Sequence, residues 1–178
     1  LFRSAKAELE DCLELFAGNP AMQAKTLGSL ADLFHRQGDP AQAIAQQRRA
    51  LALCDQLPDP VDRAISHNNL AGYLEASGTT AALAEAPGHQ LAALAYLLAA
   101  WLGQHLQTSF GNYAIVFRRA RAAGTGPDIP RLAALLADPG FAALAPWLRQ
   151  RRIDPAALQA DIDAFLDQAR EAASDAAD

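Results

Sequence analysis

The sequence contains little that would support a disulfide framework, a membrane span or a β-sheet. Its 178 residues include two cysteines, Cys12 and Cys54, which are too few for a disulfide framework or a cysteine-rich metal site, so we expect free, buried thiols. The longest apolar run, Leu91 to Leu102, has twelve residues, whereas a bilayer span needs about 20. β-Branched residues are scarce, and alanine and leucine are abundant, a composition that favours helices. We therefore expect an all-α protein that does not span a membrane.

Motifs of catalytic chemistry are also missing. The four histidines, His35, His67, His89 and His105, are scattered, and none has a second histidine or a cysteine at metal-ligand spacing on its own helix. A metal site would have to be assembled from distant helices. The sequence has no G-x-S-x-G elbow and no G-x-x-x-x-G-K-S/T phosphate loop. We therefore predict no enzyme activity, no cofactor and no bound metal.

The most informative stretch runs from Ala24 to Leu57 and predicts two helices folded against each other. Apolar residues at three- and four-residue spacing mark one face of the first helix: Leu27, Leu30, Ala31 and Phe34. Gly38 can take the left-handed conformation that closes a helix, and Asp39-Pro40 can then cap and start the next one. The second helix has small residues in its apolar face, which suits a close antiparallel pair: Ala43, Ile44, Ala50, Leu51 and Cys54.

The same pattern returns forty residues later. Leu30, Ala31, Phe34 and Gly38 are matched by Leu70, Ala71, Leu74 and Gly78. Repetition at a period of about 20 to 50 residues is typical of solenoids built from stacked hairpins. On these residues the stretch resembles a tetratricopeptide repeat, with the family's turn glycine at Gly38 and its two small second-helix residues at Ala43 and Ala50. Leu27 stands where the family usually has tryptophan. The resemblance implies a right-handed superhelix of antiparallel helical hairpins.

The repeats and the rest of the chain define two regions. Residues 1–103 are assigned to tetratricopeptide-like repeats: a half repeat at 1–20, a repeat at 24–57 and a degenerate repeat at 60–103. Pro87-Gly88 is expected to break a helix, so about 80–88 are interpreted as an inserted turn or loop. The insertion is either drift or a contact loop, and drift is favoured because loop insertions cost little. Residues 104–178 are assigned to C-terminal capping helices. A weaker similarity to the C-terminal ends of large bacterial multi-repeat proteins implies a cytoplasmic bacterial protein with further repeats before Leu1.

The capping region is expected to contain four helices. Their predicted ranges are about 106–122, 130–137, one from Pro139 that Pro146 kinks or splits, and one from Pro155 whose inward face carries Leu158, Ile162, Phe165 and Leu166. The basic residues Arg118, Arg119 and Arg121 form a second candidate surface. They either pack beside the acidic last helix or meet an acidic partner. Nucleic acid is disfavoured, because the net charge is −5 and no nucleic-acid motif is present.

The resemblance also places a binding surface. In the family, first helices line a concave groove that binds protein segments. Mapped by position, the candidate partner-binding residues here are Lys25, Asp32, His35, Arg36, Asn68, Asn69, Gly72 and Glu75. Asn69 matches an asparagine that bonds a ligand backbone, whereas too few cations converge for the family's carboxylate clamp. We predict a non-enzymatic scaffold that binds a protein or peptide segment. The alternative is a purely structural cap without a ligand. We also expect self-association through the apolar face of the N-terminal helix, which carries Leu9, Cys12, Leu13 and Phe16.

Overall fold

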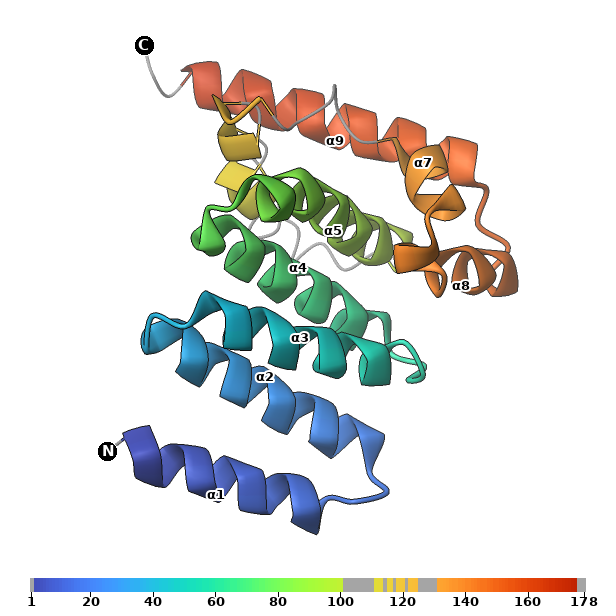
Figure 1. Ribbon diagram of the computed structural model, residues 1–178. Coiled ribbons are helices and arrows are strands. Elements are labelled where there is room, and N and C mark those ends of the chain that lie inside the picture. Colours follow the sequence, from blue (N-terminus) through green and yellow to red (C-terminus); the bar gives the residue numbers. More distant parts are fainter. Residues whose placement is uncertain are drawn as a thin grey trace.

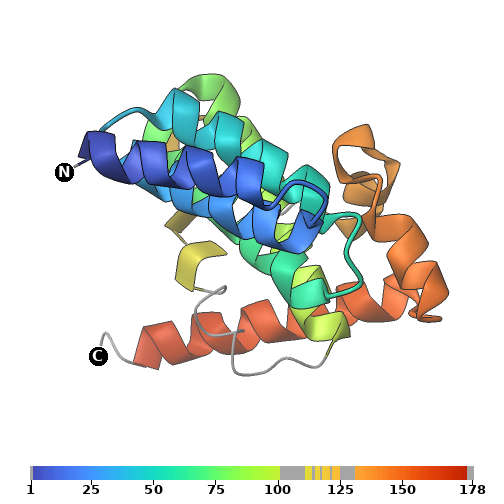
Figure 2. The same ribbon diagram turned by 90° about the horizontal axis from the view of Figure 1, so that it is seen from below.

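The protein is a stack of α-helices. The computed structural model describes residues 2–100, 111–113, 115–116, 118–120, 122–124 and 131–175, and these residues form helices and connections without any strand. The stack contains, in chain order, α1 (Phe2–Leu15), α2 (Pro20–Arg36), α3 (Pro40–Cys54), α4 (Pro60–Ser77) and α5 (Thr80–Ala99). Each of these helices packs on the next, and α9 (Pro155–Asp175) lies beside α5 at the far end (Figure 1 and Figure 2). The prediction of an all-α repeat fold is confirmed.

Local capping chemistry explains where these helices begin. Pro20, Pro40 and Pro60 are the first residues of α2, α3 and α4, where a missing backbone N–H costs nothing. The residue before each proline accepts a hydrogen bond from the first turn. Asp39 Oδ1, for example, accepts from the Gln42 amide at 3.0 Å. The helix starts are therefore determined by short sequence motifs.

Two glycines end first helices in the left-handed conformation. Gly38 has φ of 76° and Gly78 has φ of 66°. The amides of Gly38 and Asp39 donate to the carbonyls of His35 and Phe34, both at 3.0 Å, which satisfies the last carbonyls of α2. The predicted left-handed backbone at both positions is confirmed. The apolar stripe that precedes Gly38 is also buried, with Leu27 and Leu30 each 3% exposed.

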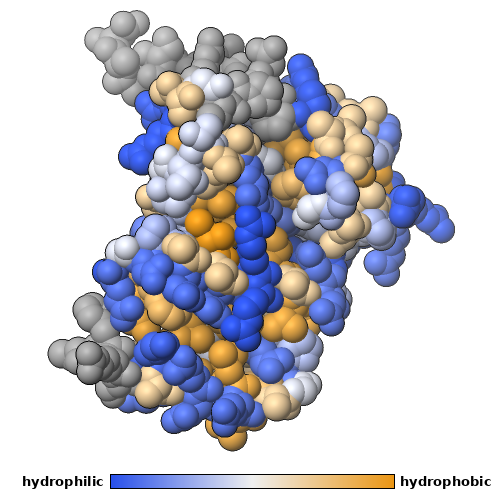
Figure 3. Space-filling model, in the orientation of Figure 1, coloured by the Kyte–Doolittle hydropathy of each residue, from blue (hydrophilic) through white to orange (hydrophobic). Residues whose placement is uncertain are grey.

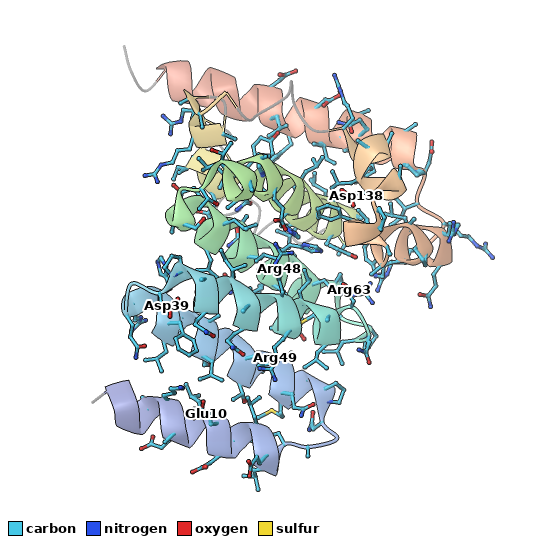
Figure 4. The ribbon with its side chains drawn as sticks, in the orientation of Figure 1. Glu10, Asp39, Arg48, Arg49, Arg63 and Asp138 are labelled. Carbon is cyan, nitrogen blue, oxygen red and sulfur yellow. The ribbon has the colours of Figure 1, made fainter. Side chains whose placement is uncertain are left out.

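A buried arginine fixes the connection between α3 and α4. The guanidinium of Arg63 donates to the carbonyls of Cys54, Asp55 and Leu57, at 3.2, 2.9 and 2.7 Å (Figure 4). These carbonyls belong to the end of α3 and the turn after it, and the Cys54 carbonyl also accepts from the Leu57 amide at 3.0 Å. Arg63 therefore adds side-chain hydrogen bonds at the point where the backbone bonds of α3 end.

The expected break at Pro87-Gly88 is wrong. Helix α5 runs without interruption from Thr80 to Ala99, with Pro87 inside it. A proline in a helix interior costs about 3 kcal/mol. The packing of α5 outweighs that cost, because Ala86, Leu91 and Leu94 are fully buried around the proline and each large aliphatic side chain contributes about 1.5–3 kcal/mol. Residues 80–88 are thus part of a helix and do not form a loop.

The C-terminal segment covers the far side of α5. It contains α7 (Leu132–Ala137), a 3-10 turn η1 (Pro139–Phe141), α8 (Leu144–Gln150) and α9. One apolar cluster joins them to α5, including Leu94 and Leu97 of α5, Leu132 of α7, Leu148 of α8, and Leu158, Ile162 and Leu166 of α9. The expected inward face of the last helix is confirmed by the burial of Leu158, Ile162 and Leu166 and by the packing of the partly buried Phe165.

The helix expected from Pro139 is split before Pro146. The break lies between Phe141 and Leu144, and Pro146 sits in the first turn of α8, where amides have no intrahelical partner anyway. The helix predicted at about 106–122 falls partly outside the described residues. Residues 111–113, 115–116, 118–120 and 122 are helical, and Arg121 lies outside the described part.

Candidate functional site

A first hollow lies between α2 and α4, and side chains of α3 form its floor. It encloses about 520 Å³. Its lining includes Lys25, Gly28, Ser29 and Asp32 from α2, Gln47 and Cys54 from α3, and Asp62, Ile65, Ser66, Asn69 and Tyr73 from α4. Two of the wall residues, Lys25 and Asp62, carry opposite charges.

A second hollow adjoins the first. It encloses about 410 Å³ and is lined by Asp32 and His35 from α2, by Asn68, Asn69, Gly72, Tyr73, Glu75 and Ala76 from α4, by Gln90 from α5, and by Asn112, Ile115 and Val116. The two hollows share Asp32, Asn69 and Tyr73. They therefore form one continuous surface, which we call the groove.

The predicted partner-binding residues coincide with the groove, with one exception. Lys25, Asp32, His35, Asn68, Asn69, Gly72 and Glu75 each line at least one hollow. Arg36 lines neither, and its guanidinium instead pairs with Asp32 at 2.9 Å. Seven of the eight predicted residues therefore line the groove, and their role in binding stays a prediction.

A tetratricopeptide repeat model matches residues 22–84, which run from α2 into the start of α5. This segment belongs to the tetratricopeptide repeat family. Such repeats are typically non-enzymatic and generally mediate protein–protein interactions. No curated protein and no solved structure matches the chain.

Two of the predicted groove residues of the tetratricopeptide repeats are engaged inside the protein. Asn68 Oδ1 accepts from Gln90 Nε2 at 3.2 Å and from Asn112 Nδ2 at 2.9 Å. Glu75 forms an ion pair with Arg119. These contacts tie α4 to the elements that follow it. Asn68 and Glu75 thus hold the wall of the groove in place.

Sequence reasoning missed three kinds of groove residue. Tyr73 lies on the ridge between the hollows, with its ring centroid 5.2 Å from that of His35, and burial raises the pKa of Tyr73 to about 12. Gln47 forms part of the floor and donates from Nε2 to Ser66. Asn112 comes from outside the matched repeats. Of these, only Tyr73 carried a local signal, because it follows Gly72 on a first helix.

The floor of the groove contains a buried cysteine. Cys54 is buried, and its Sγ lies 3.4 Å from Ser66 Oγ. Burial raises the pKa of the Cys54 thiol, which keeps it protonated and poorly nucleophilic. The other cysteine, Cys12, is half-buried in α1, so the expectation of two buried free thiols holds fully for Cys54 alone.

The basic residues of the second candidate surface are only partly described. Arg119 pairs with Glu75 of α4, and Arg121 lies outside the described residues. The acidic helix α9 finds an arginine within the molecule, because Arg131 Nη1 lies 2.9 Å from Asp163 Oδ2. Arg131 therefore pairs with α9, whereas Arg119 pairs with α4, so the predicted packing of Arg118, Arg119 and Arg121 beside the last helix stays a prediction.

Within the described ranges, no group of three or more histidine, cysteine, aspartate or glutamate side chains could hold a metal ion. In the same part of the chain, no helix is both long and apolar enough to cross a membrane. The structure does bring together two histidines that the sequence left apart, His67 and His89. Their contact lies behind α4, away from the lining of the groove.

Proposed function

We propose that the protein is a non-enzymatic scaffold that binds an extended or helical protein segment in the groove. The observation that carries this proposal is the ridge of Asp32, Asn69 and Tyr73, which borders both hollows. One ligand segment can therefore contact both hollows at once. The match of α2 to α4 with tetratricopeptide repeats supports a protein partner.

The lining suggests what such a segment should contain. Gly28 of α2 and Gly72 of α4 line the groove. Because glycine has no side chain, these two positions leave room for the backbone of a ligand. Ile65 and Ile115, which are 47% and 44% exposed, place one apolar contact in each hollow. Asn69 stands between them as a hydrogen-bonding group. We expect a ligand with two apolar side chains separated by backbone that bonds to Asn69, bound at micromolar Kd, about −8 kcal/mol.

A filling substitution tests the proposal. A side chain at Gly72 would meet no atom within 4 Å at Cβ, so Gly72→Leu should occupy the second hollow without straining α4. Peptides selected from a random twelve-residue display library should bind Gly72→Leu and Asn69→Ala at least tenfold more weakly than the unaltered protein. Ala45→Leu is the matched control, because Ala45 is exposed on α3 and lines neither hollow.

The outcomes separate the candidate surfaces. Peptides that bind the groove variants as tightly as the unaltered protein would exclude the groove. Binding that is instead abolished by Arg118→Ala would move the working surface to the basic residues near Arg119. Melting temperatures of all variants, measured in parallel, ensure that a loss of binding is not a loss of folding.

A second candidate function is a structural cap without a ligand. It is favoured by the cluster that joins α5 to the C-terminal helices, because these helices cover an apolar face that the end of a repeat array would otherwise expose. A library selection that enriches no sequence above the Gly72→Leu background would support the cap.

Self-association through α1 is a further part of the proposal. The predicted contact residues Leu9, Cys12, Leu13 and Phe16 are half-buried, whereas Leu15 at the end of α1 is 77% exposed, and hydrophobic surface is visible at the end of the molecule where α1 lies (Figure 3). Large exposed apolar side chains are common at contact surfaces. Sedimentation velocity should detect a dimer that Leu15→Glu weakens, and a strictly monomeric protein at high concentration would exclude this contact.

A further inference from the structure

Two buried histidines meet where the repeats join the C-terminal segment. His67 of α4 and His89 of α5 are 3% and 4% exposed, and their Nδ1 atoms lie 2.9 Å apart. His89 Nε2 lies 3.0 Å from Glu85 Oε1. The other oxygen of Glu85 pairs with Arg48 of α3 at 2.8 Å (Figure 4). The imidazole pair thus connects three helices of the repeats.

The C-terminal segment closes over this pair. The Phe141 ring of η1 lies 5.7 Å from the His67 ring and 4.9 Å from the His89 ring. Phe141 reaches α5 closely because Gly88 has no side chain, and a Cβ there would lie 3.1 Å from Phe141 Cζ. On the other side, the Tyr96 ring lies 5.8 Å from His67 and 4.9 Å from Trp147 of α8. The two imidazoles therefore form a polar part of the otherwise apolar contact between the repeats and η1 and α8.

Hydrogen-bond chemistry sets the number of protons the pair can hold. The Glu85 carboxylate can only accept, so His89 donates through Nε2. In the neutral ring, His89 Nδ1 is then an acceptor, and His67 Nδ1 must donate to it. One added proton can be accommodated, either on His67 Nε2 with the roles of the two Nδ1 atoms unchanged, or on His89 with those roles exchanged. Two added protons would place two N–H donors against each other at 2.9 Å, which the contact cannot accommodate.

Some of the charged groups around the pair disfavour protonation of the imidazoles, and others favour it. Burial, His89 and the Arg63 guanidinium of α4 hold the pKa of His67 well below its ordinary value. The hydrogen bond from His89, together with Arg48, lowers the pKa of Glu85, so this carboxylate stays ionised at neutral pH. Asp55, at the end of α3, also contributes negative charge toward His89.

The remaining polar groups nearby do not supply a compensating charge. Burial raises the pKa of Tyr96 to about 12, so its hydroxyl is neutral. The Asp138 carboxylate next to η1 accepts from the Gly140 amide at 2.7 Å and serves as the cap of that turn. A proton on His67 therefore has no carboxylate as a direct partner.

We propose that the histidine pair is a proton-sensitive joint: acidification below about pH 6.5 weakens the contact between α5 and the segment formed by η1 and α8 by raising the equilibrium constant for its opening. The folded joint holds fewer protons than two free imidazoles, so the open form takes up protons as the pH falls. The contribution of the neutral histidine pair to the stability of the joint is complete above the ordinary histidine pKa. This contribution decreases as the pH falls below that value. For each histidine that stays neutral in the closed form, the opening constant rises about tenfold between pH 7.5 and pH 5.5.

The first test compares unfolding constants from urea titrations at pH 7.5 and pH 5.5. His67→Asn removes the titrating ring and keeps a polar atom near the position of Nδ1. We expect the acid-induced rise in the unfolding constant to be about tenfold smaller in His67→Asn than in the unaltered protein. His35→Asn is the matched control, because it makes the same substitution at an exposed position of α2, outside the histidine pair. An equal rise in the unaltered protein and in His67→Asn would overturn the proposal.

The second test uses the unaltered chain and does not depend on a variant that folds. In a histidine NMR titration, the His67 ring should remain neutral in the folded protein down to pH 5.5. In hydrogen exchange corrected for the intrinsic rate, amides of Phe141 to Gln150 should lose protection at pH 5.5 while those of α2 and α3 keep theirs. Titration of His67 near pH 6.5 without structural change, or equal protection of both regions at both pH values, would refute the joint.

Discussion

The removal of the Arg63 guanidinium should unfold the connection between α3 and α4. In Arg63→Met the aliphatic part of the side chain stays, but three hydrogen bonds are lost, at 3.2, 2.9 and 2.7 Å. A hydrogen bond from a charged group contributes about 1.5–3 kcal/mol. Bonds from one guanidinium are not additive, and the carbonyls of Asp55 and Leu57 can regain water because these residues are half-buried. We therefore expect a loss of about 3–4 kcal/mol.

The same substitution should change the ionisation of Asp55. Burial raises the pKa of this carboxyl group, and the positive charge of Arg63 opposes the increase. Without the guanidinium, the pKa of Asp55 should rise further. Since a raised carboxyl pKa means that the folded state binds a proton more readily than the unfolded chain, the destabilisation should be smaller at pH 4 than at pH 7.

Urea denaturation at pH 7 measures the first effect and its repetition at pH 4 measures the second, with Arg49→Met as the control. Arg49 is exposed on α3, and its guanidinium bonds the side chain of Gln46 at 2.7 Å (Figure 4). Its loss should cost less than about 0.5 kcal/mol. If Arg63→Met costs less than about 1 kcal/mol, or no more than Arg49→Met, then the three bonds do not hold the connection and the reasoning fails.

Three further predictions concern the turns, the joint and the tyrosines. Gly38→Val should cost about 1–2 kcal/mol, because φ at Gly38 is 76°, and an unchanged melting temperature would contradict this. Gly88→Ala should cost about 1–3 kcal/mol through displacement of Phe141, offset by about 1 kcal/mol of helix propensity; a more stable variant would show that Phe141 moves freely. Tyr73 and Tyr96 should ionise only near pH 12 in an absorbance titration at high pH, and their contribution to stability should be lost as the pH rises from about 10 through about 12. Two tyrosines that titrate near pH 10 in the folded protein would contradict their burial.

Much of the groove followed from the sequence. Gly28, Asp32, Asn69 and Gly72 recur at helical spacing opposite the apolar stripes of the first helices, so their common face could be predicted once the repeats were recognised. The pairing of Arg36 with Asp32 could not be predicted, because spacing along a helix does not say where a long side chain turns. The third wall, with Asn112 and Ile115, depends on how a later segment packs against α4.

The sequence by itself determined the positions of the first turns. Asp39-Pro40 and Gly38 act within a few residues of each other, through a side-chain cap, a preset φ and a left-handed backbone, so their effect does not depend on distant contacts. The burial of Leu27 and Leu30 followed for the same reason, because the helical period is a local property.

Tertiary structure decided the features in which local preference conflicts with packing. Pro87 stays inside α5 because fully buried neighbours such as Leu91 and Leu94 outweigh the lost backbone bond. His67 and His89 are twenty-two positions apart, and only the pairing of α4 with α5 brings their Nδ1 atoms to 2.9 Å. A contact of this kind cannot be predicted from the spacing of residues along the sequence. It depends on the relative position of two helices, which only their packing determines.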